Sequence, residues 1–188
     1  MKNAIVLTGG VASGKSSAAR FLKERGFNVI DADEIARALF VEFSKKIEAV
    51  FGTLDRAAIA KRIFSDKNER AKLEAILHPP IRARVFAESE KLEKLNKRYF
   101  IDVPLFFEKR DEYPIDDVLL IYAPRSTQLK RLIGERKIGE LDALAMIDAQ
   151  IPIDEKKKNA KWIIDNDGDL DRLRDQIDRF IETEIGIL

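Results

Sequence analysis

The sequence contains no cysteine, and His78 is its only histidine. The lack of cysteine excludes a disulfide framework, a thiolate zinc site, an iron–sulfur cluster and a cysteine nucleophile. A single histidine excludes a metal site built from several histidines of one chain. Any metal ion bound by this chain is therefore expected to be a hard cation held by oxygen atoms.

The chain also has little net charge and no long apolar run. Thirty-four lysines and arginines stand against 33 aspartates and glutamates, which gives a formal charge of +1. This balance removes the usual electrostatic argument for nucleic-acid binding, and it implies no macromolecular partner. No run approaches the roughly 20 apolar residues of a membrane span, and the short run at the N-terminus does not suit a signal peptide. We therefore expect a cytoplasmic protein without nucleic acid or membrane as partner.

The length of 188 residues suits a single domain. Short apolar runs rich in β-branched residues lie between longer segments with helical spacing, and such runs are typical of strands buried on both faces. This alternation predicts an α/β fold with a five-stranded, mainly parallel sheet and helices on both faces. The expected strands are Ala4 to Thr8, Phe27 to Ile30, Arg98 to Val103, Val118 to Tyr122 and Trp162 to Ile164.

Two stretches are longer than a crossover helix requires. Residues 34–97 show only helix-like spacing and predict a helical insertion on the substrate side. Residues 134–159 are rich in charge and include Lys156-Lys157-Lys158. Such a run is commonly a solvated helix face; the alternative is a mobile lid that brings cations to phosphates. The candidates for that charge are Arg131, Arg136 and Lys137, among which spacing alone does not choose.

The segment Gly9-Gly10-Val11-Ala12-Ser13-Gly14-Lys15-Ser16 fits the pattern G-x-x-x-x-G-K-[ST] between an expected strand and an expected helix. In this pattern glycines permit positive φ, and backbone N–H groups and the helix dipole face phosphate oxygens. Lys15 would contact the β- and γ-phosphates, and the Ser16 hydroxyl would bind Mg²⁺. The motif predicts a nucleoside-triphosphate site. Its expected nucleotide contacts are Gly10, Val11, Ala12, Ser13, Gly14, Lys15, Ser16 and Ser17.

Acidic residues stand at the ends of two other expected strands. Asp31 and Asp33 follow the second strand, where a carboxylate would orient or deprotonate an attacking hydroxyl, although either residue alone suits a helix N-cap. Asp102 ends the third strand and is either a Mg²⁺ ligand or a structural residue. His78 precedes Pro79-Pro80, which are expected to end one helix and begin another. The plain interpretation of His78 is a capping or surface residue.

Further ordered motifs accompany the phosphate loop, and together they resemble the dephospho-coenzyme A kinase family over nearly the whole chain. They are Val29-Ile30-Asp31-Ala32-Asp33 continuing to Arg37, Thr53-Leu54-Asp55-Arg56, Leu77-His78-Pro79, Asp102-Val103-Pro104-Leu105-Phe106-Phe107-Glu108, Gln128-Leu129-Lys130-Arg131, Ala149-Gln150, and Ile164-Asp165-Asn166-Asp167-Gly168. The resemblance implies a P-loop kinase fold. It also implies ATP-dependent phosphorylation of the ribose 3′-hydroxyl of dephospho-coenzyme A, the last step of coenzyme A biosynthesis.

The resemblance further implies roles for individual residues, with ATP and Mg²⁺ as cofactors. Asp33 becomes the base or orienting group for the hydroxyl, residues 134–159 become the lid, and Asn166 and Gly168 lie near adenine. Arg136 becomes the lid arginine from a shifted position, since Glu135-Arg136 replaces the usual Arg-Asp. The residues assigned to the acceptor are Asp33, Arg37, His78, Leu105 and Phe106. Ala12 stands where the family commonly has glycine; a methyl group is tolerated there if φ is negative, and on that basis this departure is given no weight.

Other classes of protein share the phosphate loop. Another small P-loop kinase acting on a nucleoside or nucleotide is the nearest alternative, because the loop contacts phosphates and not the acceptor. A GTP-dependent switch is disfavoured by the lack of an Asn-Lys-x-Asp tetrapeptide. A binding module without activity would not need both Lys15 and Asp33.

Overall fold

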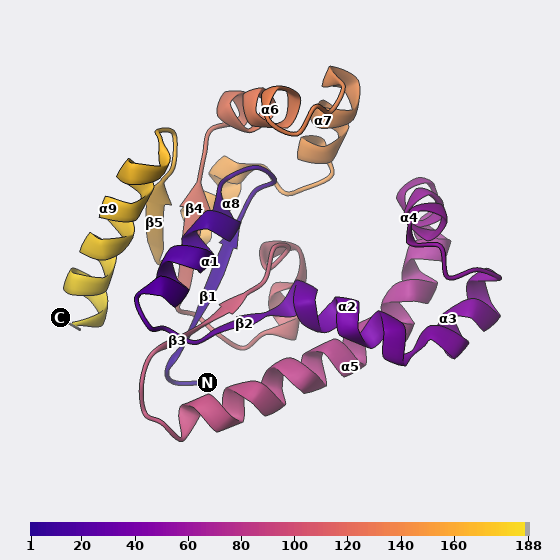
Figure 1. Cartoon of the computed structure of the whole chain (residues 1–188), viewed down its shortest axis with the longest axis horizontal. Coiled ribbons are helices and arrows are strands. Elements are labelled where there is room, and N and C mark those ends of the chain that lie inside the picture. The colour runs from indigo at the N-terminus through magenta and orange to yellow at the C-terminus, as the bar shows by residue number, and fades with distance from the viewer. Residues whose placement is uncertain (187–188) are drawn as a thin grey trace. The chain divides into compact units, whose positions relative to one another are not determined.

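The computed structural model describes residues 1–186, apart from the side chain of Phe64. The chain divides into two compact units. The first unit consists of Met1–Ile30 and Lys91–Leu188, and the second of Asp31–Glu90 (Figure 1). Among the described residues, no helix is both long enough and apolar enough to cross a membrane.

The expected five-stranded parallel sheet is confirmed. The strands are β1 (Ala4–Gly9), β2 (Val29–Asp31), β3 (Tyr99–Asp102), β4 (Val118–Tyr122) and β5 (Trp162–Asp165). Their order is β2-β3-β1-β4-β5, so β1 lies at the centre between β3 and β4. Since ligands of open α/β sheets bind at the carboxyl ends of the strands, the loops that follow β1, β3, β4 and β5 form the edge of interest.

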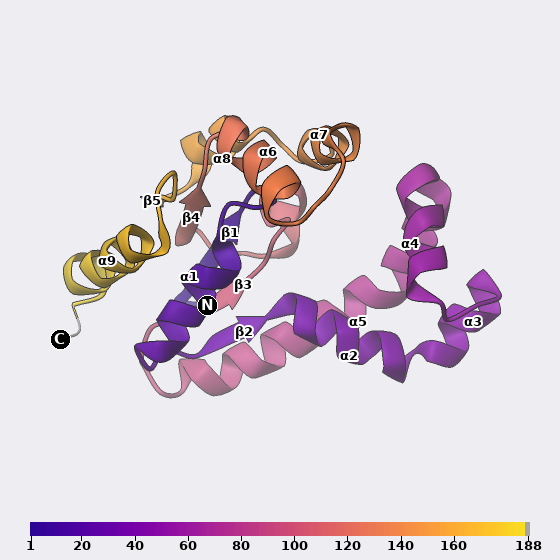
Figure 2. The ribbon, with the colours of Figure 1, turned by 45° about the horizontal axis from the view of Figure 1, so that its top comes forward.

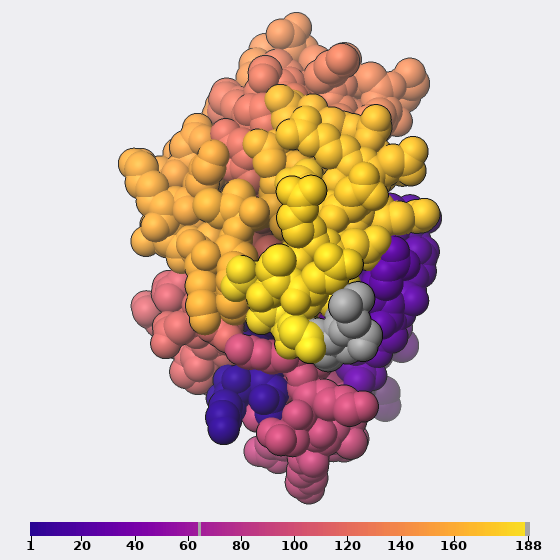
Figure 3. All heavy atoms as spheres, turned by 90° about the vertical axis from the view of Figure 1, so that its left-hand side faces the viewer, coloured from indigo at the N-terminus to yellow at the C-terminus, as the bar shows by residue number. Residues whose placement is uncertain are grey.

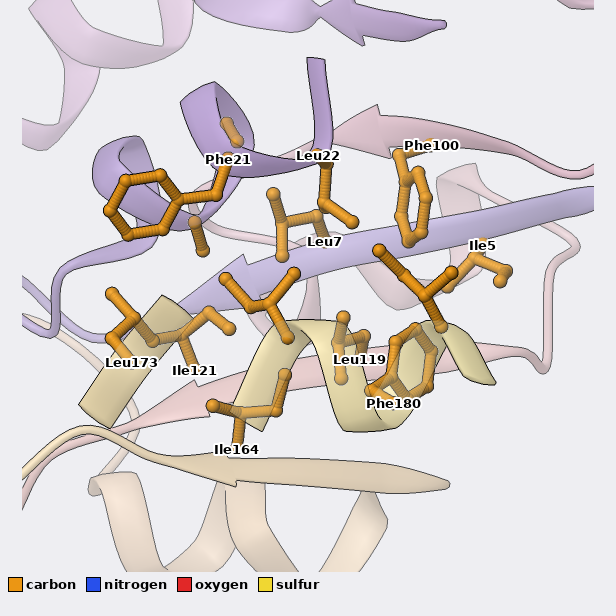
Figure 4. Packing of buried hydrophobic residues seen from close by; sticks show 14 residues of the cluster. Ile5, Leu7, Phe21, Leu22, Phe100, Leu119, Ile121, Ile164, Leu173 and Phe180 are labelled. Atoms are coloured by element: carbon orange, nitrogen blue, oxygen red, sulfur yellow. The ribbon is translucent and has the colours of Figure 1, made fainter. Parts of the chain in front are cut away.

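One face of the sheet packs against two helices, α1 (Lys15–Glu24) and α9 (Leu170–Phe180). Figure 4 shows Phe21 and Leu22 of α1 and Leu173 and Phe180 of α9 meeting the inward side chains of the strands. The opposite side of α9 carries exposed charged residues and forms the middle of the face in Figure 3. This amphipathic spacing is what made both helices predictable.

The other face of the sheet is covered as well. Ala4, Val6 and Thr8 alternate with the residues that face α1 and α9, and they are also buried. Helix α8 (Ile153–Asn159) contacts β4 and buries Ile153. Figure 2 shows α6 (Arg125–Gly134) and α7 (Glu140–Asp148) side by side, and the chain ends with the short η2 (Ile181–Ile185) after α9.

The second unit is helical, as the spacing predicted for the insertion. Its elements are α2 (Ala32–Glu42), α3 (Ser44–Phe51), α4 (Arg56–Ser65) and most of α5 (Lys67–Glu93). The predicted break at Pro79-Pro80 is wrong, because α5 runs through both prolines. Prolines leave carbonyl groups one turn earlier without a partner. Buried apolar side chains on both sides, Leu77 before and Val85 after, hold the helix in place despite this loss.

Candidate active site

The phosphate loop joins β1 to α1. Within it, Ser13 N–H donates to the Gly10 carbonyl over 3.1 Å. Gly14 is the N-cap of α1, and its carbonyl accepts hydrogen bonds from the N–H groups of Ser17 and Ala18. The N–H groups of Lys15 and Ser16 in the first helical turn have no acceptor among the described residues. They are therefore available to an anion at the helix N-terminus.

Gly14 must be glycine for two reasons. Its φ is +92°, a left-handed conformation that glycine adopts without steric cost. A Cβ atom at this position would also overlap the side-chain amide of Asn166, which is buried and donates to the Ser13 carbonyl over 2.7 Å. The loop after β5 therefore packs directly against the phosphate loop.

Ala12 corrects one expectation. Its φ is +55°, not negative, so its methyl group sits in the left-handed region, which costs about 1–2 kcal/mol for a residue with a Cβ atom. The curl of the loop imposes this conformation. Ala12 and Val11 pack against a small apolar cluster that α6 and α7 bury, and this contact offsets part of the cost. The buried members of that cluster are Leu132, Ala143 and Ile147.

Lys15 and Asp102 meet at the carboxyl ends of β1 and β3. Their side chains form an ion pair and are only 14% and 6% exposed. The pairing follows from the sheet register, in which Leu7 of β1 lies opposite Asp102 of β3. Ser16 is exposed in the first turn of α1. The structure thus brings together Lys15, predicted in the phosphate loop, and Asp102, predicted at the end of the third strand.

Arg131 ties two loops together. It was a candidate for charge brought by the lid, but its guanidinium donates to three backbone carbonyl groups. The acceptors are Ala12 at 3.3 Å, Asn166 at 2.9 Å and Gly168 at 3.1 Å. These hydrogen bonds join the phosphate loop to the loop that follows β5. Asn166 and Gly168, the expected adenine contacts, are held in that second loop.

The segment after α6 carries the remaining lid candidates. Arg136 and Lys137 are both exposed, and Lys137 has a φ of +57°. The Arg136 N–H donates to the Arg131 carbonyl over 3.2 Å, which tightens the end of α6. Among the described residues the Arg136 guanidinium has no partner, so it is available to a ligand.

Two residues that follow α7 were not assigned a role from the sequence. Gln150 accepts a hydrogen bond from the Val11 N–H over 2.9 Å. Lys156 is fully buried and lies 2.7 Å from Glu108, measured from Nζ to Oε1. The interpretation of Lys156-Lys157-Lys158 as a uniformly solvated run is therefore wrong for its first member. The signal was present in the helical period, because Lys156 lies three residues after Ile153 and shares its buried face.

Two residues of the first unit were expected to contact the acceptor, and the structure separates them. Leu105 is 42% exposed. Phe106 is fully buried and makes edge contacts with Phe107 at 5.3 Å between ring centroids. The Phe106 side chain therefore belongs to the core, and Leu105 is the one that a ligand can reach.

The other acceptor candidates lie in the second unit. Asp31 is the N-cap of α2, and its side chain accepts from the Glu34 N–H over 2.9 Å. This leaves Asp33 exposed in the first turn of α2, and Arg37 is exposed one turn later. His78 lies inside α5 with Nε2 4.0 Å from Glu74 Oε1, so it is not the residue at a helix end that the sequence suggested.

Two groups, one at the end of β4 and one at the end of α7, have shifted pKa values. Burial and then a hydrogen bond to Asp154 raise the pKa of the Tyr122 hydroxyl, which stays protonated at neutral pH. The hydrogen bond from Arg125 lowers the pKa of Asp148. This ion pair joins the start of α6 to the end of α7. Both pairs fix the ends of the helices that surround the phosphate loop.

Comparison with known proteins identifies the family. The family model described as dephospho-CoA kinase matches residues 3–172. A dephospho-CoA kinase from Wolinella succinogenes is 44% identical over 188 residues, covering 96% of this chain and 94% of the relative. One from Helicobacter pylori strain J99 is 38% identical, with 97% and 98% covered.

Solved structures agree with the sequence relatives. The structure of dephospho-CoA kinase from Campylobacter jejuni superposes with a TM-score of 0.75 at 31% identity and covers 98% of both chains. A Thermus thermophilus protein gives a TM-score of 0.82 at 32% identity, covering 96% of this chain and 97% of that one. The resemblance inferred from the motifs is confirmed, and the chain belongs to the dephospho-CoA kinase family of phosphotransferases.

Proposed function

We propose that this protein transfers the γ-phosphoryl group of ATP to the ribose 3′-hydroxyl of dephospho-coenzyme A, giving coenzyme A and ADP. The observation that carries the proposal is the phosphate loop with Lys15 beside Asp102, in a chain that matches one kinase family over residues 3–172. In the reaction, the bond between the γ-phosphorus and the β,γ-bridging oxygen breaks, and a bond to the 3′-oxygen forms. The hydroxyl proton leaves to a base.

The phosphate loop would bind the β- and γ-phosphates through Lys15 and the free N–H groups of the first turn of α1. The positive charge of Lys15 is paired with the carboxylate of Asp102. We infer that the phosphates take over this charge when ATP binds. Catalysis then rests on positioning and on charge neutralisation around the transferred group.

The donor set suits Mg²⁺ held together with a nucleotide. No cluster of three or more acidic or histidine residues that would cage a metal ion occurs in the described part of the chain. Mg²⁺ is usually held by one or two protein oxygens, several waters and substrate phosphates. The Ser16 hydroxyl and the Asp102 carboxylate are the residues that would hold it. When bound with ATP, Mg²⁺ neutralises phosphate charge.

Asp33 is proposed as the base or orienting group for the 3′-hydroxyl. Its carboxylate is exposed, whereas that of Asp31 caps α2, so of these two aspartates Asp33 is the one whose side chain is not used as the cap. A carboxylate next to the reacting hydroxyl aligns its lone pair and accepts its proton. Arg37, His78 and Leu105 are proposed to contact the acceptor, and Phe106 to support Leu105 from the core.

The remaining assignments follow from the proposed reaction. Arg136 is proposed to bring positive charge from the lid, residues 134–159, and Asn166 and Gly168 to lie beside adenine. Residues 34–97 are proposed to form the acceptor-binding lobe of a single kinase domain. A reaction between two small molecules requires no macromolecular partner, and its ATP and Mg²⁺ are supplied in the cytoplasm, which is the proposed location.

An ADP-release assay with ATP and Mg²⁺ tests the function directly. Dephospho-coenzyme A, AMP, adenosine and no acceptor are compared, and phosphorus NMR of the product determines which oxygen carries the new phosphate. Release that depends on dephospho-coenzyme A, with a 3′-phosphate in the product, supports the proposal. Release only with another acceptor keeps the P-loop chemistry and overturns the assigned substrate.

A further inference from the structure

The connection between α7 and α8 is attached to the phosphate loop. At its start, the Gln150 side-chain oxygen accepts a hydrogen bond from the Val11 N–H over 2.9 Å. The next residue, Ile151, donates its N–H to Glu108 Oε1 over 3.0 Å. We call residues 150–156 the strap, because they join the loop to Glu108.

At the other end of the strap, Lys156 forms an ion pair with the same carboxylate, that of Glu108. Its Nζ lies 2.7 Å from Glu108 Oε1, with the lysine side chain fully buried and Glu108 only 17% exposed. Burying two charges costs more solvation energy than their attraction commonly returns, so such a pair is poor evidence for stability. Its best-attested use is to fix one register of packing. The pair therefore needs a role other than stability.

The strap also touches the phosphate loop at a second point. A Cβ atom added to Gly10 would lie 3.2 Å from Ile153 Cδ1 and 2.7 Å from Gln128 Nε2. Gln128 is itself buried and donates to the Ala123 carbonyl over 2.9 Å. Gly10 and Val11 are thus held on one side by residues that follow α7, and a shift of the strap displaces the loop.

We propose that Gln150 is a positioning residue for phosphoryl transfer: its side-chain oxygen fixes the Val11 peptide of the phosphate loop, and the buried pair of Glu108 and Lys156 holds the strap in the register that this hydrogen bond requires. The inference rests on the proposed function only in that ATP is the ligand. Gln150 stands two residues after α7 ends at Asp148, so its hydrogen bond adds a polar link between the lid and the loop to the apolar packing of Val11 and Ala12 against α7.

The test measures ATP affinity by titration calorimetry without any acceptor, so its outcome does not depend on which substrate is phosphorylated. Gln150→Met keeps the length of the side chain and removes the acceptor oxygen. We expect ATP to bind about three- to tenfold more weakly, as for the loss of one hydrogen bond, with a nearly unchanged melting temperature. The KM for dephospho-coenzyme A should stay at the wild-type value.

The ion pair is tested by the double variant Glu108→Gln with Lys156→Met, which leaves neither buried charge unpaired. Lys156→Met alone would strand a carboxylate and destabilise the fold. We expect the double variant to fold and to weaken ATP binding by a similar factor. Adding Gln150→Met to it should cost nothing further, because the pair acts through Gln150.

A matched control is the exposed pair of Arg25 and Asp178, at the opposite end of α1 from the phosphate loop. Arg25→Gln with Asp178→Asn should leave ATP affinity unchanged. Wild-type ATP affinity in Gln150→Met would overturn the proposal, as would an equal loss of affinity for ATP and dephospho-coenzyme A. If the triple variant loses ATP affinity by the product of the two separate fold-losses, the link between the ion pair and Gln150 is overturned.

Discussion

Gly14→Ala should destabilise the protein far more than an alanine at another glycine with the same backbone conformation. The first cost is left-handed backbone, about 1–2 kcal/mol for a residue with a Cβ atom. The second is the overlap of the new methyl group with the buried Asn166 amide. Displacing that amide breaks its 2.7 Å hydrogen bond to the Ser13 carbonyl and leaves buried polar groups unsatisfied. This costs about 1–3 kcal/mol of stability in addition.

Gly26→Ala is the matched control, at the far end of the same helix. Gly26 has a φ of +86°, and nothing lies within 4 Å of a Cβ atom placed there, so only the backbone cost applies. At about 2–4 °C per kcal/mol for a chain of this size, we expect a fall in melting temperature of roughly 3–6 °C for Gly26→Ala and 8–15 °C for Gly14→Ala.

Thermal unfolding measured by calorimetry decides the matter. In a double-mutant cycle, Asn166→Ala removes the obstructing amide, so the combined effect of Gly14→Ala and Asn166→Ala should be smaller than the sum. Equal shifts for the two glycine variants, or strict additivity in the cycle, would refute the close packing of the two loops.

Three further predictions concern separate parts of the chain. Asp33→Asn should lower turnover about a hundredfold or more with the KM for ATP unchanged, in the ADP-release assay; near-normal turnover would remove Asp33 from the mechanism. Phe106→Ala should cost about 3–5 kcal/mol of stability in urea unfolding, whereas Leu105→Ala should cost little and instead raise the KM for dephospho-coenzyme A; a stable Phe106→Ala protein would contradict its place in the core. Burial opposes ionisation of Asp117, but hydrogen bonds from Lys161 and Arg98 outweigh it and lower its pKa. The stability that this group contributes is therefore present above the ordinary carboxylate pKa of about 3.9 and is lost as the pH falls below it. Asp117→Asn should lower the melting temperature at pH 7 and flatten the decline of the melting temperature in acid. An equally steep decline in the variant would show that Asp117 is not a source of the acid sensitivity.

Much of the fold could be predicted because the sheet is buried on both faces. Strands such as β1 and β4 then carry runs of four consecutive apolar residues, a pattern that solvent-exposed strands lack. The phosphate loop was equally predictable, because its glycines and Lys15 are required at fixed spacing. Backbone details were less accessible. The spacing did not reveal the positive φ of Ala12 or the passage of α5 through two prolines, since packing elsewhere in the chain compensates for both local costs.

Local pattern also failed where two residues compete for one role. Asp31 and Asp33 are both acids beside a helix start, and only the course of the backbone assigns the N-cap to Asp31. Lys156 belongs to a run of three lysines that is typical of a solvated helix face, but of the three only Lys156 is buried. The two aspartates could be told apart only by three-dimensional packing, whereas the spacing of Lys156 from Ile153 in the helical period did indicate its buried face.

The contacts that hold the loops around the phosphate loop together could not be predicted from the sequence, because they are made to peptide groups. Gln150 binds a peptide N–H that is 139 residues away in sequence, and Asn166 binds a carbonyl group 153 residues away. Arg131 likewise donates to three backbone carbonyl groups. Every residue except proline offers the same N–H and carbonyl groups, so the identity of a side chain carries no information about which peptide it will hold. The parts of the site that follow from the sequence are those whose chemistry needs a particular side chain at the ligand, such as Lys15. The parts that hold the loops in place depend on peptide groups, and they become identifiable only when the fold brings distant loops together.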